Sequence, residues 1–351
     1  MAPEVAPIRA GEEIDPAALA RYLRGKVEGV EGGIAIQQFP GGHSNLTYLL
    51  RAGDREYVLR RPPLGPVAPK AHDMAREFRV LQAVHPLFPP APRVYLVCED
   101  ASVIGATFFL MERRRGIVLR RDLPSEFPGD AGLPRKISAA FIDCLAQLHL
   151  IDVARHGLDS LGRPEGFLER QVRGWTDRWE RARTEELPGL GHLVHWLMEK
   201  LPPSGTPALV HNDFKLDNMM LDATDPGRVE AVLDWEMTTV GDPLLDLGCT
   251  LCYWTEAGDP EFRGGALSGI TTGAGWYTRE ELVRRYAQKT GRDVSHLGYY
   301  EVLGLFKLGV ILQQIYFRYH RGQTHDERFR DFHLRVRGLL RAAVDLAERL
   351  R

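Results

Sequence analysis

The sequence has 351 residues, 26% charged and 44% hydrophobic, which is ordinary for a soluble globular protein and excludes a disordered or collagen-like chain. Its 45 basic and 47 acidic residues leave a formal charge of −2, which gives no electrostatic support for nucleic-acid binding. Four scattered cysteines, no secretory signal, and a most apolar stretch (302–312) that is short and contains Lys307 lead us to expect a cytoplasmic protein with no membrane partner.

The first hundred residues have the pattern of short strands. Residues 34–39, 45–51 and 56–61 are rich in apolar and β-branched side chains and are separated by tight Gly-Gly and Ala-Gly-Asp turns. Connections this short cannot carry crossover helices, so these strands should be antiparallel. A helix is predicted from Met74, Phe78 and Leu81, and strands near 93–98 and 107–112 would complete a five-stranded sheet.

Helical periodicity dominates after Arg113. Only two short strand-like pieces interrupt it, at 218–221 and 229–233. A strand-rich N-terminal part and a helix-rich C-terminal part indicate an α+β protein with two lobes, residues 1–112 and residues 113–351. The predicted helices cover 135–150, 166–183, 190–201, 279–290, 296–319 and 326–350.

The densest polar cluster lies within two phrases, LVHNDFKLDNMMLD from residue 209 and VLDWEMTTVGDPLLDLG from residue 232. Asp234 and Glu236 follow an apolar strand two residues apart, so both carboxylates can point to one face. Carboxylates with a carboxamide suit Mg²⁺, whereas zinc would require histidine and cysteine. Taken alone, Asp213 would be interpreted as a solvated turn residue and Asp234 as a helix N-cap; their joint spacing with the neighbouring polar residues argues against this.

The spacing His211-x-Asp213-x-Lys215-x-x-Asn218 matches a kinase catalytic loop, and Asp234 falls where the metal-binding aspartate of kinases belongs. With GGHSNLTYLL (41–50), YVLRRPP (57–63) and FFLME (108–112), the chain resembles the aminoglycoside phosphotransferase and choline kinase superfamily. It is most similar to phosphotransferases related to the kinase-like domain fused to some acyl-CoA dehydrogenases.

This resemblance implies a protein-kinase-like fold, with residues 1–112 as the nucleotide-binding lobe and residues 113–351 as the catalytic and substrate lobe. It also implies ATP and Mg²⁺ as cofactors. Asp213 would orient the acceptor hydroxyl and take its proton, and Lys215 would face the transferring phosphate. Asn218 and Asp234 would hold Mg²⁺, and Glu236 is a weaker candidate for the same ion. His211 is interpreted as a structural brace of the loop.

A separate set of residues is predicted to bind the nucleotide. The Gly-Gly turn with Ser44 and Asn45 could bring backbone N–H groups to phosphates, although alone it is an ordinary β-turn. Arg60 takes the place of the usual strand-three lysine, and because side chains alternate, only Arg60 or Arg61 can face the cleft. Glu77 falls on the apolar face of its helix, so we expect it to pair with Arg60. Glu112 lies at the predicted hinge, where backbone would contact adenine.

The short segment between Asp234 and Asp246, eleven residues long, leaves no room for the activation segment of a protein kinase and favours a small-molecule hydroxyl acceptor. Residues 152–203 carry nine acidic and eight basic side chains, and the sequence from Phe317 onward contains nine arginines and five acidic residues. This balance argues against a polycationic acceptor and favours a neutral or anionic hydroxylated metabolite, including hydroxyacyl compounds. An aminoglycoside or choline-type kinase and a nucleotide-binding pseudokinase remain alternatives, and the oligomeric state is open.

Two further groups are interpreted as structural. Asp242 and Asp246 in GDPLLD should be scaffold for the catalytic loop rather than ligands. Cys249 and Cys252 form a C-x-x-C on an apolar, helical run without a second pair, which indicates buried thiols rather than zinc or redox chemistry.

Overall fold

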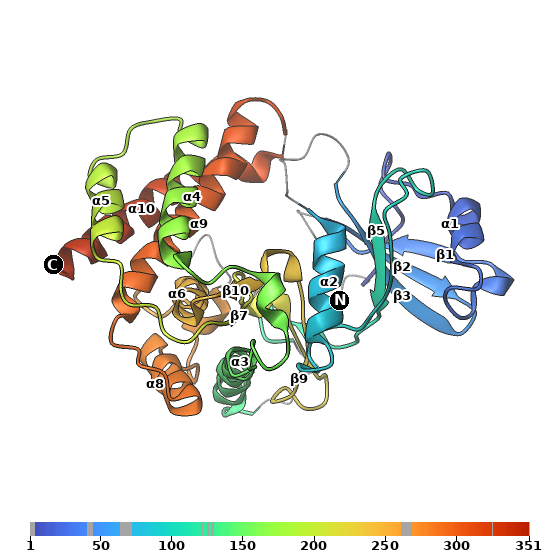
Figure 1. Ribbon diagram of the computed structural model, residues 1–351, viewed down its shortest axis with the longest axis horizontal. Helices are drawn as coiled ribbons and strands as arrows, with labels where there is room; N and C mark the ends of the chain where they lie inside the picture. The colour runs from blue at the N-terminus through green and yellow to red at the C-terminus, as the bar shows by residue number, and fades with distance from the viewer. Residues whose placement is uncertain are drawn as a thin grey trace. The chain divides into compact units, whose positions relative to one another are not determined.

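The computed structural model describes residues 4–40, 45–63, 72–120, 122–124, 127, 130–260, 269–324 and 326–350 (Figure 1). The chain forms two compact units. The first unit consists of Met1–Gly116 and Glu230–Thr238, and the second of Ile117–Val229 and Thr239–Arg351. The sequence pattern changes character near the end of the first range, but it does not indicate that residues 230–238 belong to the first unit.

The first unit is built on a five-stranded antiparallel sheet with the order β1-β2-β3-β5-β4. The antiparallel arrangement predicted from the short turns is therefore confirmed. Gly53, with φ 58°, makes the tight turn between β2 and β3, in which Ala52 pairs with Arg55. The strands are β1 (Ala35–Gln38), β2 (Leu46–Ala52), β3 (Arg55–Arg61), β4 (Val94–Cys98) and β5 (Phe108–Glu112).

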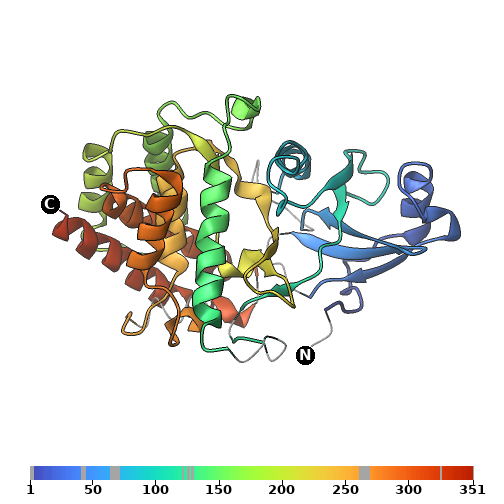
Figure 2. The same cartoon turned by 90° about the horizontal axis from the view of Figure 1, so that it is seen from below.

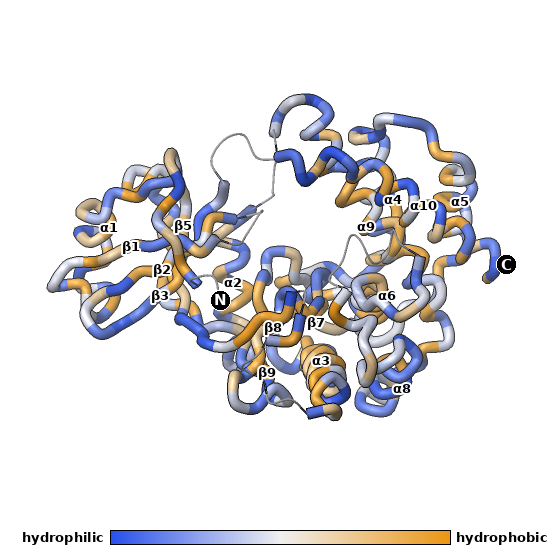
Figure 3. Tube along the Cα trace, turned by 180° about the vertical axis from the view of Figure 1, so that it is seen from behind, coloured by the Kyte–Doolittle hydropathy of each residue, from blue (hydrophilic) through white to orange (hydrophobic). Residues whose placement is uncertain are grey.

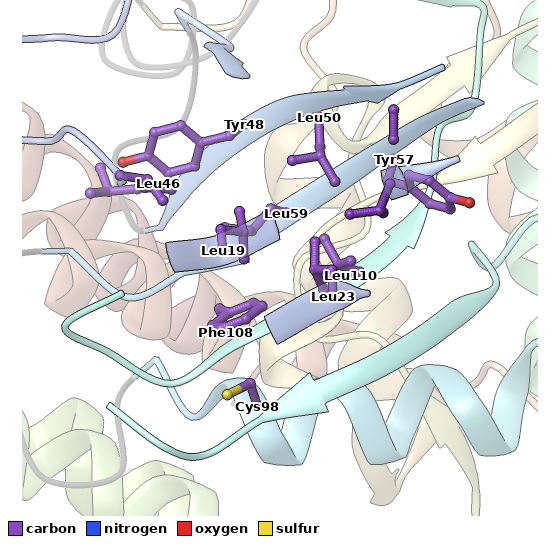
Figure 4. Close-up of a cluster of buried hydrophobic side chains, with 13 residues drawn as sticks. Leu19, Leu23, Leu46, Tyr48, Leu50, Tyr57, Leu59, Cys98, Phe108 and Leu110 are labelled. Carbon is purple, nitrogen blue, oxygen red and sulfur yellow. The ribbon is translucent and has the colours of Figure 1, made fainter. Parts of the chain in front are cut away.

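One face of this sheet is covered by α1 (Pro16–Leu23), a helix that the sequence analysis missed. Asp15 caps its N-terminus by accepting from the Ala17 N–H, and Pro16 occupies the first turn, where a missing N–H is harmless. Figure 4 shows the resulting core, in which Leu19 and Leu23 meet apolar side chains from alternate positions of the strands. The strand residues labelled there include Leu46, Tyr48, Leu50, Tyr57, Leu59, Phe108 and Leu110.

α2 (Met74–Val84) packs against β4 and β5. Asp73 caps α2, and the rings of Phe78 and Phe109 meet edge to face with 6.5 Å between their centroids. The segment 230–238 joins this unit through β9 (Val229–Val232) and the short helix Trp235–Met237. Trp235 is buried against Phe88, so this segment is part of the core of the first unit.

The second unit is mainly helical. α9 packs against α4, α6 and α10, and α3, whose length is visible in Figure 2, packs against α8. In Figure 3 α3 is mostly in the colours of apolar residues, as expected for a helix with buried Ile137, Phe141 and Leu145. The helices are α3 (Leu133–His149), α4 (Phe167–Ala182), α5 (Leu190–Glu199), α6 (Pro243–Tyr253), α8 (Arg279–Thr290), α9 (Leu297–His320) and α10 (Phe332–Arg349).

Short strands complete the second unit. β7 (Ala208–Val210) pairs with β10 (Thr239–Gly241), and β6 (Ile117–Val118) pairs with β8 (Met219–Leu221), all antiparallel. The strand pieces predicted at 218–221 and 229–233 are confirmed as β8 and β9. Among the helices of the described residues, none has the length and apolar character needed to cross a membrane.

Candidate active site

The second unit carries one candidate group of functional side chains in the loop 211–218, which follows β7 and leads into β8. The carboxylate of Asp213 is its focus: Lys215 Nζ lies 2.7 Å from Asp213 Oδ2, and Asn218 Nδ2 donates to the same oxygen at 2.8 Å. Asn218 Nδ2 also donates to the carbonyl of Asp213 at 2.9 Å. The three polar residues that the spacing singled out are thus brought together in one loop, with the amide nitrogen of Asn218 occupied by Asp213.

Tyr253, at the end of α6, borders this group and was not identified from the sequence. Its ring lies 5.0 Å from Lys215 Nζ. Burial raises the pKa of Tyr253 well above its usual value, and the nearby Asp213 carboxylate, with which its hydroxyl interacts, raises it further. Asp213 therefore lies between a cation and a phenol that stays protonated.

Asp246 of α6 holds the beginning of the loop. It is fully buried, and its two carboxylate oxygens accept the backbone N–H groups of His211 at 2.5 Å and Asn212 at 2.8 Å. His149 Nε2 lies 3.2 Å from the same carboxylate. Burial alone would raise the pKa of Asp246, but the hydrogen bonds and positive fields of His149 and His211 hold it below its usual value. Asp246 is thus a scaffold residue, as expected.

Further contacts of the loop involve His211 and side chains of α6. His211 is buried, and its Nδ1 accepts the backbone N–H of Asp213 at 3.3 Å. Thr250, one turn after Asp246 on α6, donates to the carbonyl of Phe214 at 3.0 Å. Asp242 also has a scaffold role, because it caps α6 and accepts from the Tyr300 hydroxyl at 2.7 Å.

The first unit carries a separate group of charged side chains, centred on Arg60. The expected ion pair is formed: Arg60 Nη1 lies 3.2 Å from Glu77 Oε1, and Arg60 Nη2 donates to Asp234 Oδ1 at 3.1 Å. Burial would lower the pKa of Arg60, but the charges of Glu77, Asp234 and Glu236 outweigh it and raise that pKa. Burial raises the pKa of Glu77 to about 7. The charge of Arg60 acts to lower this pKa, but the nearby carboxylates of Asp234 and Glu236 raise it.

Arg61, the alternative candidate to Arg60, points to the opposite face of the sheet. Its Nη2 donates to the carbonyl of Glu12 at 2.7 Å and to the Tyr48 hydroxyl at 2.8 Å. The alternation of side chains along β3 therefore assigns Arg60 to the face that carries α2 and Asp234.

Glu236 gathers side chains from two other parts of the first unit. Asn45 Nδ2 donates to Glu236 Oε2 at 2.9 Å, and His72 Nδ1 lies 3.4 Å from the same oxygen. Arg76 of α2 donates through Nη1 to the carbonyl of Glu236 at 2.7 Å and through Nη2 to the carbonyl of Thr238. Arg76 and His72 were not identified from the sequence, since neither belongs to a motif.

Among the residues that the structure describes, several buried polar atoms of this cluster have no hydrogen-bond partner: Asn45 Oδ1, Arg60 Nε and Glu77 Oε2. Such atoms are rare in folded proteins and indicate a place for a polar ligand or water. The residue types in each unit are those that a hard divalent cation such as Mg²⁺ prefers: Asp234 and Glu236 carry carboxylate oxygens in the first unit, and Asn218 carries a carboxamide oxygen in the second. In the described part of the chain, no group of three or more His, Cys, Asp or Glu is arranged to hold a metal ion.

Three remaining expectations concern Ser44, Glu112 and the two cysteines of the C-x-x-C. Ser44 lies outside the described residues. Glu112 ends β5, where its carboxylate accepts the Arg93 N–H at 3.1 Å and pairs with Arg114. Cys249 and Cys252 are buried and form no disulfide, as is also true of Cys98 and Cys144.

Comparison with known proteins gives matches over nearly the whole chain. The model of the phosphotransferase enzyme family (APH) matches residues 35–282. Acyl-CoA dehydrogenase family member 10 of Mus musculus is 36% identical over 326 residues, covering 92% of this chain and 30% of that protein. Acyl-CoA dehydrogenase family member 11 of Gallus gallus is 33% identical over 357 residues, covering 99% of this chain and 45% of that protein. The chain thus spans less than half the length of these relatives.

Solved structures of phosphotransferases are also similar to this chain. A candidate aminoglycoside phosphotransferase from Ralstonia eutropha JMP134 has a TM-score of 0.81 at 31% identity, covering 96% of this chain and 99% of that one. Aminoglycoside phosphotransferase APH(4)-Ia in ternary complex with AMP-PNP and hygromycin B has a TM-score of 0.61 at 19% identity, covering 94% and 98%, and shows the shared fold alone. The predicted fold class, with an antiparallel five-stranded sheet and a mainly helical C-terminal part, is confirmed.

Proposed function

Because the chain belongs to the phosphotransferase enzyme family, we propose that it moves the γ-phosphoryl group of ATP to a hydroxyl group of a small molecule. The observation that carries this proposal is the constellation in loop 211–218. A carboxylate with an adjacent ammonium and carboxamide is the set that phosphoryl transfer requires, since this reaction depends on positioning and charge compensation.

In this proposal Asp213 accepts a hydrogen bond from the acceptor hydroxyl and receives its proton as the hydroxyl oxygen attacks phosphorus. Lys215 supplies a positive charge beside that carboxylate and near the transferring group. Asn218 would offer its carbonyl oxygen to Mg²⁺, because its amide nitrogen already donates to Asp213. When bound, Mg²⁺ would neutralise charge on the phosphates.

The first unit would hold the nucleotide. Asp234 is the proposed metal ligand of this unit, with Glu236 as a second candidate, and Arg60 would face the phosphates while Glu77 fixes its position. Arginine suits this place because its fork of donors can serve a carboxylate and a phosphate together. Asn45, Ser44 and the backbone near Glu112 stay proposed nucleotide contacts.

We also propose that the acceptor is neutral or anionic, as a hydroxylated metabolite or hydroxyacyl compound would be. Support comes from the C-terminal arginines. Arg328, Arg330 and Arg337 form ion pairs, whereas in the described residues no carboxylate oxygen lies within 4 Å of five others. These five are Arg318, Arg321, Arg335, Arg341 and Arg349. Uncompensated cations attract anions and repel an aminoglycoside.

The test is a screen of hydroxylated compounds for ADP formation with Mg²⁺ and ATP, using wild type and Asp213→Asn. The variant should lower kcat by ~10²–10⁴ while ATP affinity is retained, because a positioned base is lost but no nucleotide contact. Asp217→Asn is the matched control, since this exposed carboxylate lies in the same loop, and its kcat should stay near wild type.

Two results would contradict the proposal. Equal kcat in wild type and Asp213→Asn would overturn the role of Asp213, and faster turnover of kanamycin-type aminoglycosides than of any hydroxy acid or hydroxyacyl thioester would overturn the acceptor class. Tight ATP binding without turnover on the whole library would favour a nucleotide-binding pseudokinase instead.

A further inference from the structure

Lys307 is a buried charge that the roles proposed above do not use. It lies in the middle of α9, is 3% exposed, and is the single charged residue in the apolar run 302–312. Burying an ammonium group in apolar surroundings is costly unless it finds strong polar partners. Its presence at the most apolar place in the sequence therefore requires an explanation.

The partner of Lys307 is the backbone of the candidate catalytic loop. Lys307 Nζ donates to the carbonyl of Asn212 at 2.9 Å and lies 3.4 Å from Asn212 Oδ1. The ring of Trp175 in α4 lies 5.7 Å from the same nitrogen, and Cys249 of α6 also contacts it. Within the described residues no carboxylate lies within 4 Å of Lys307 Nζ. The charge is thus directed at a residue that immediately precedes Asp213.

Asn212 has an unusual backbone that such a contact would stabilise. Its φ is 68°, in the left-handed region that costs a non-glycine residue free energy, although asparagine tolerates it better than most. Asp246 fixes the N–H of Asn212, and Lys307 fixes its carbonyl. The N–H and the carbonyl of Asn212 are therefore both bound by side chains from helices of the second unit, the N–H by an anion of α6 and the carbonyl by a cation of α9.

We propose that Lys307 is a positioning residue, which holds Asn212 in the left-handed conformation and thereby sets the direction of the Asp213 carboxylate. The effect on the loop stands on the contacts of Lys307 alone, and only the consequence for turnover rests on the proposed phosphotransferase function. Lys307 acts through the peptide unit between Asn212 and Asp213 and is not expected to touch ATP or the acceptor.

The experiment compares hydrogen exchange in the loop between wild type and Lys307→Met. Methionine fills a similar volume but cannot donate, so the amides of His211, Asn212 and Asp213 should exchange ~10-fold faster or more. Turnover of Mg²⁺-ATP should fall ~10- to 100-fold in kcat with KM for ATP nearly unchanged, because misplacement of a catalytic group costs rate rather than nucleotide binding.

Gln313→Leu is the matched control. Gln313 is also a buried polar residue of α9, but it donates to the carbonyl of Ala182 at 2.8 Å and to Thr184, away from loop 211–218. This variant should lower the melting temperature without faster exchange in the loop. The same loop exchange in Gln313→Leu and Lys307→Met would reduce Lys307 to a general packing residue and overturn the proposal.

A rescue separates conformational control from simple packing. Glycine adopts positive φ without the strain of a side chain, so Asn212→Gly added to Lys307→Met should recover part of the lost kcat and loop protection. Lys307→Arg, which keeps the charge and a donor, provides a second variant if the methionine variant folds poorly, and it should stay closer to wild type in loop exchange. No rescue by Asn212→Gly would contradict the assigned role.

The two proposals can fail separately. If wild type turns over no substrate, the proposed function fails while the exchange measurement still decides on Lys307. If wild type is active but loop exchange in Lys307→Met is unchanged, the role of Lys307 fails and the function stands.

Discussion

Three residues other than glycine have a left-handed backbone in the described part of the chain: His72, Asn212 and Asp234. Each is a candidate site residue or contacts one. Such conformations cost on the order of 1–3 kcal/mol each and persist where the surroundings fix them. Asp234 is fixed by Arg60, and Asn212 by Asp246 and Lys307. Two of the three strained residues are therefore held in place by charged side chains.

Glu77 gives a prediction at the same scale. Its pKa is raised to about 7 in the folded protein from an ordinary value near 4.5, so between these values the folded state binds more protons than the unfolded state. The Glu77 contribution to the free energy of unfolding should therefore be full below about pH 4.5 and fall as pH rises toward 7, with a slope of up to about 1.4 kcal/mol per pH unit.

Chemical denaturation of wild type and Glu77→Gln at several pH values measures this contribution. The glutamine variant keeps the shape of the side chain but does not titrate, so the difference between the two proteins should change across this window and level off above pH 7. Parallel stability curves from pH 4.5 to 7 would contradict the raised pKa of Glu77.

At the scale of elements, Arg76 joins α2 to the segment that carries Asp234. Its guanidinium donates to two backbone carbonyls of that segment, and burial lowers the pKa of Arg76, although the group stays charged at neutral pH. Arg76→Met should lower the free energy of unfolding by about 1–3 kcal/mol, because hydrogen bonds from a charged donor are lost and partly buried carbonyls are left unpaired.

Urea denaturation measures this loss, and Arg79→Met is the control. Arg79 is the next arginine on α2 but is exposed, so its replacement should change stability by less than about 0.5 kcal/mol. Similar losses in the two variants would show that Arg76 does not link α2 to residues 234–238.

The elements also show what could be predicted from the sequence. Antiparallel strands followed from turn lengths, and the Arg60–Glu77 pair followed from an acid on an apolar helix face. The contacts of Arg76 and Lys307 could not be predicted, because both side chains donate to backbone carbonyls. Every residue type has such a carbonyl, so the sequence does not identify the partner. The one available signal was a lysine within an apolar run.

At the scale of the whole molecule, the chain passes between the two units three times, because residues 230–238 leave the second unit, contribute to the first, and return. Ala231, Val232 and Trp235 are buried there, and the Val232 N–H donates to the carbonyl of Pro90 at 2.8 Å. Unfolding of the first unit must therefore release a segment whose two ends continue into the second. We expect the two units to unfold in one transition.

The four buried cysteines can test this coupling. Cys98 lies in the first unit and Cys144, Cys249 and Cys252 in the second, and all four should react slowly with a thiol reagent in the native state. Burial also raises the pKa of Cys144 and Cys249, which lowers the fraction of reactive thiolate. With increasing urea, mass spectrometry should find Cys98 labelled over the same range as the other three, because one transition exposes all of them. Labelling of Cys98 at urea concentrations that leave the others protected would mean that the first unit opens alone and that burial of residues 230–238 does not couple the units.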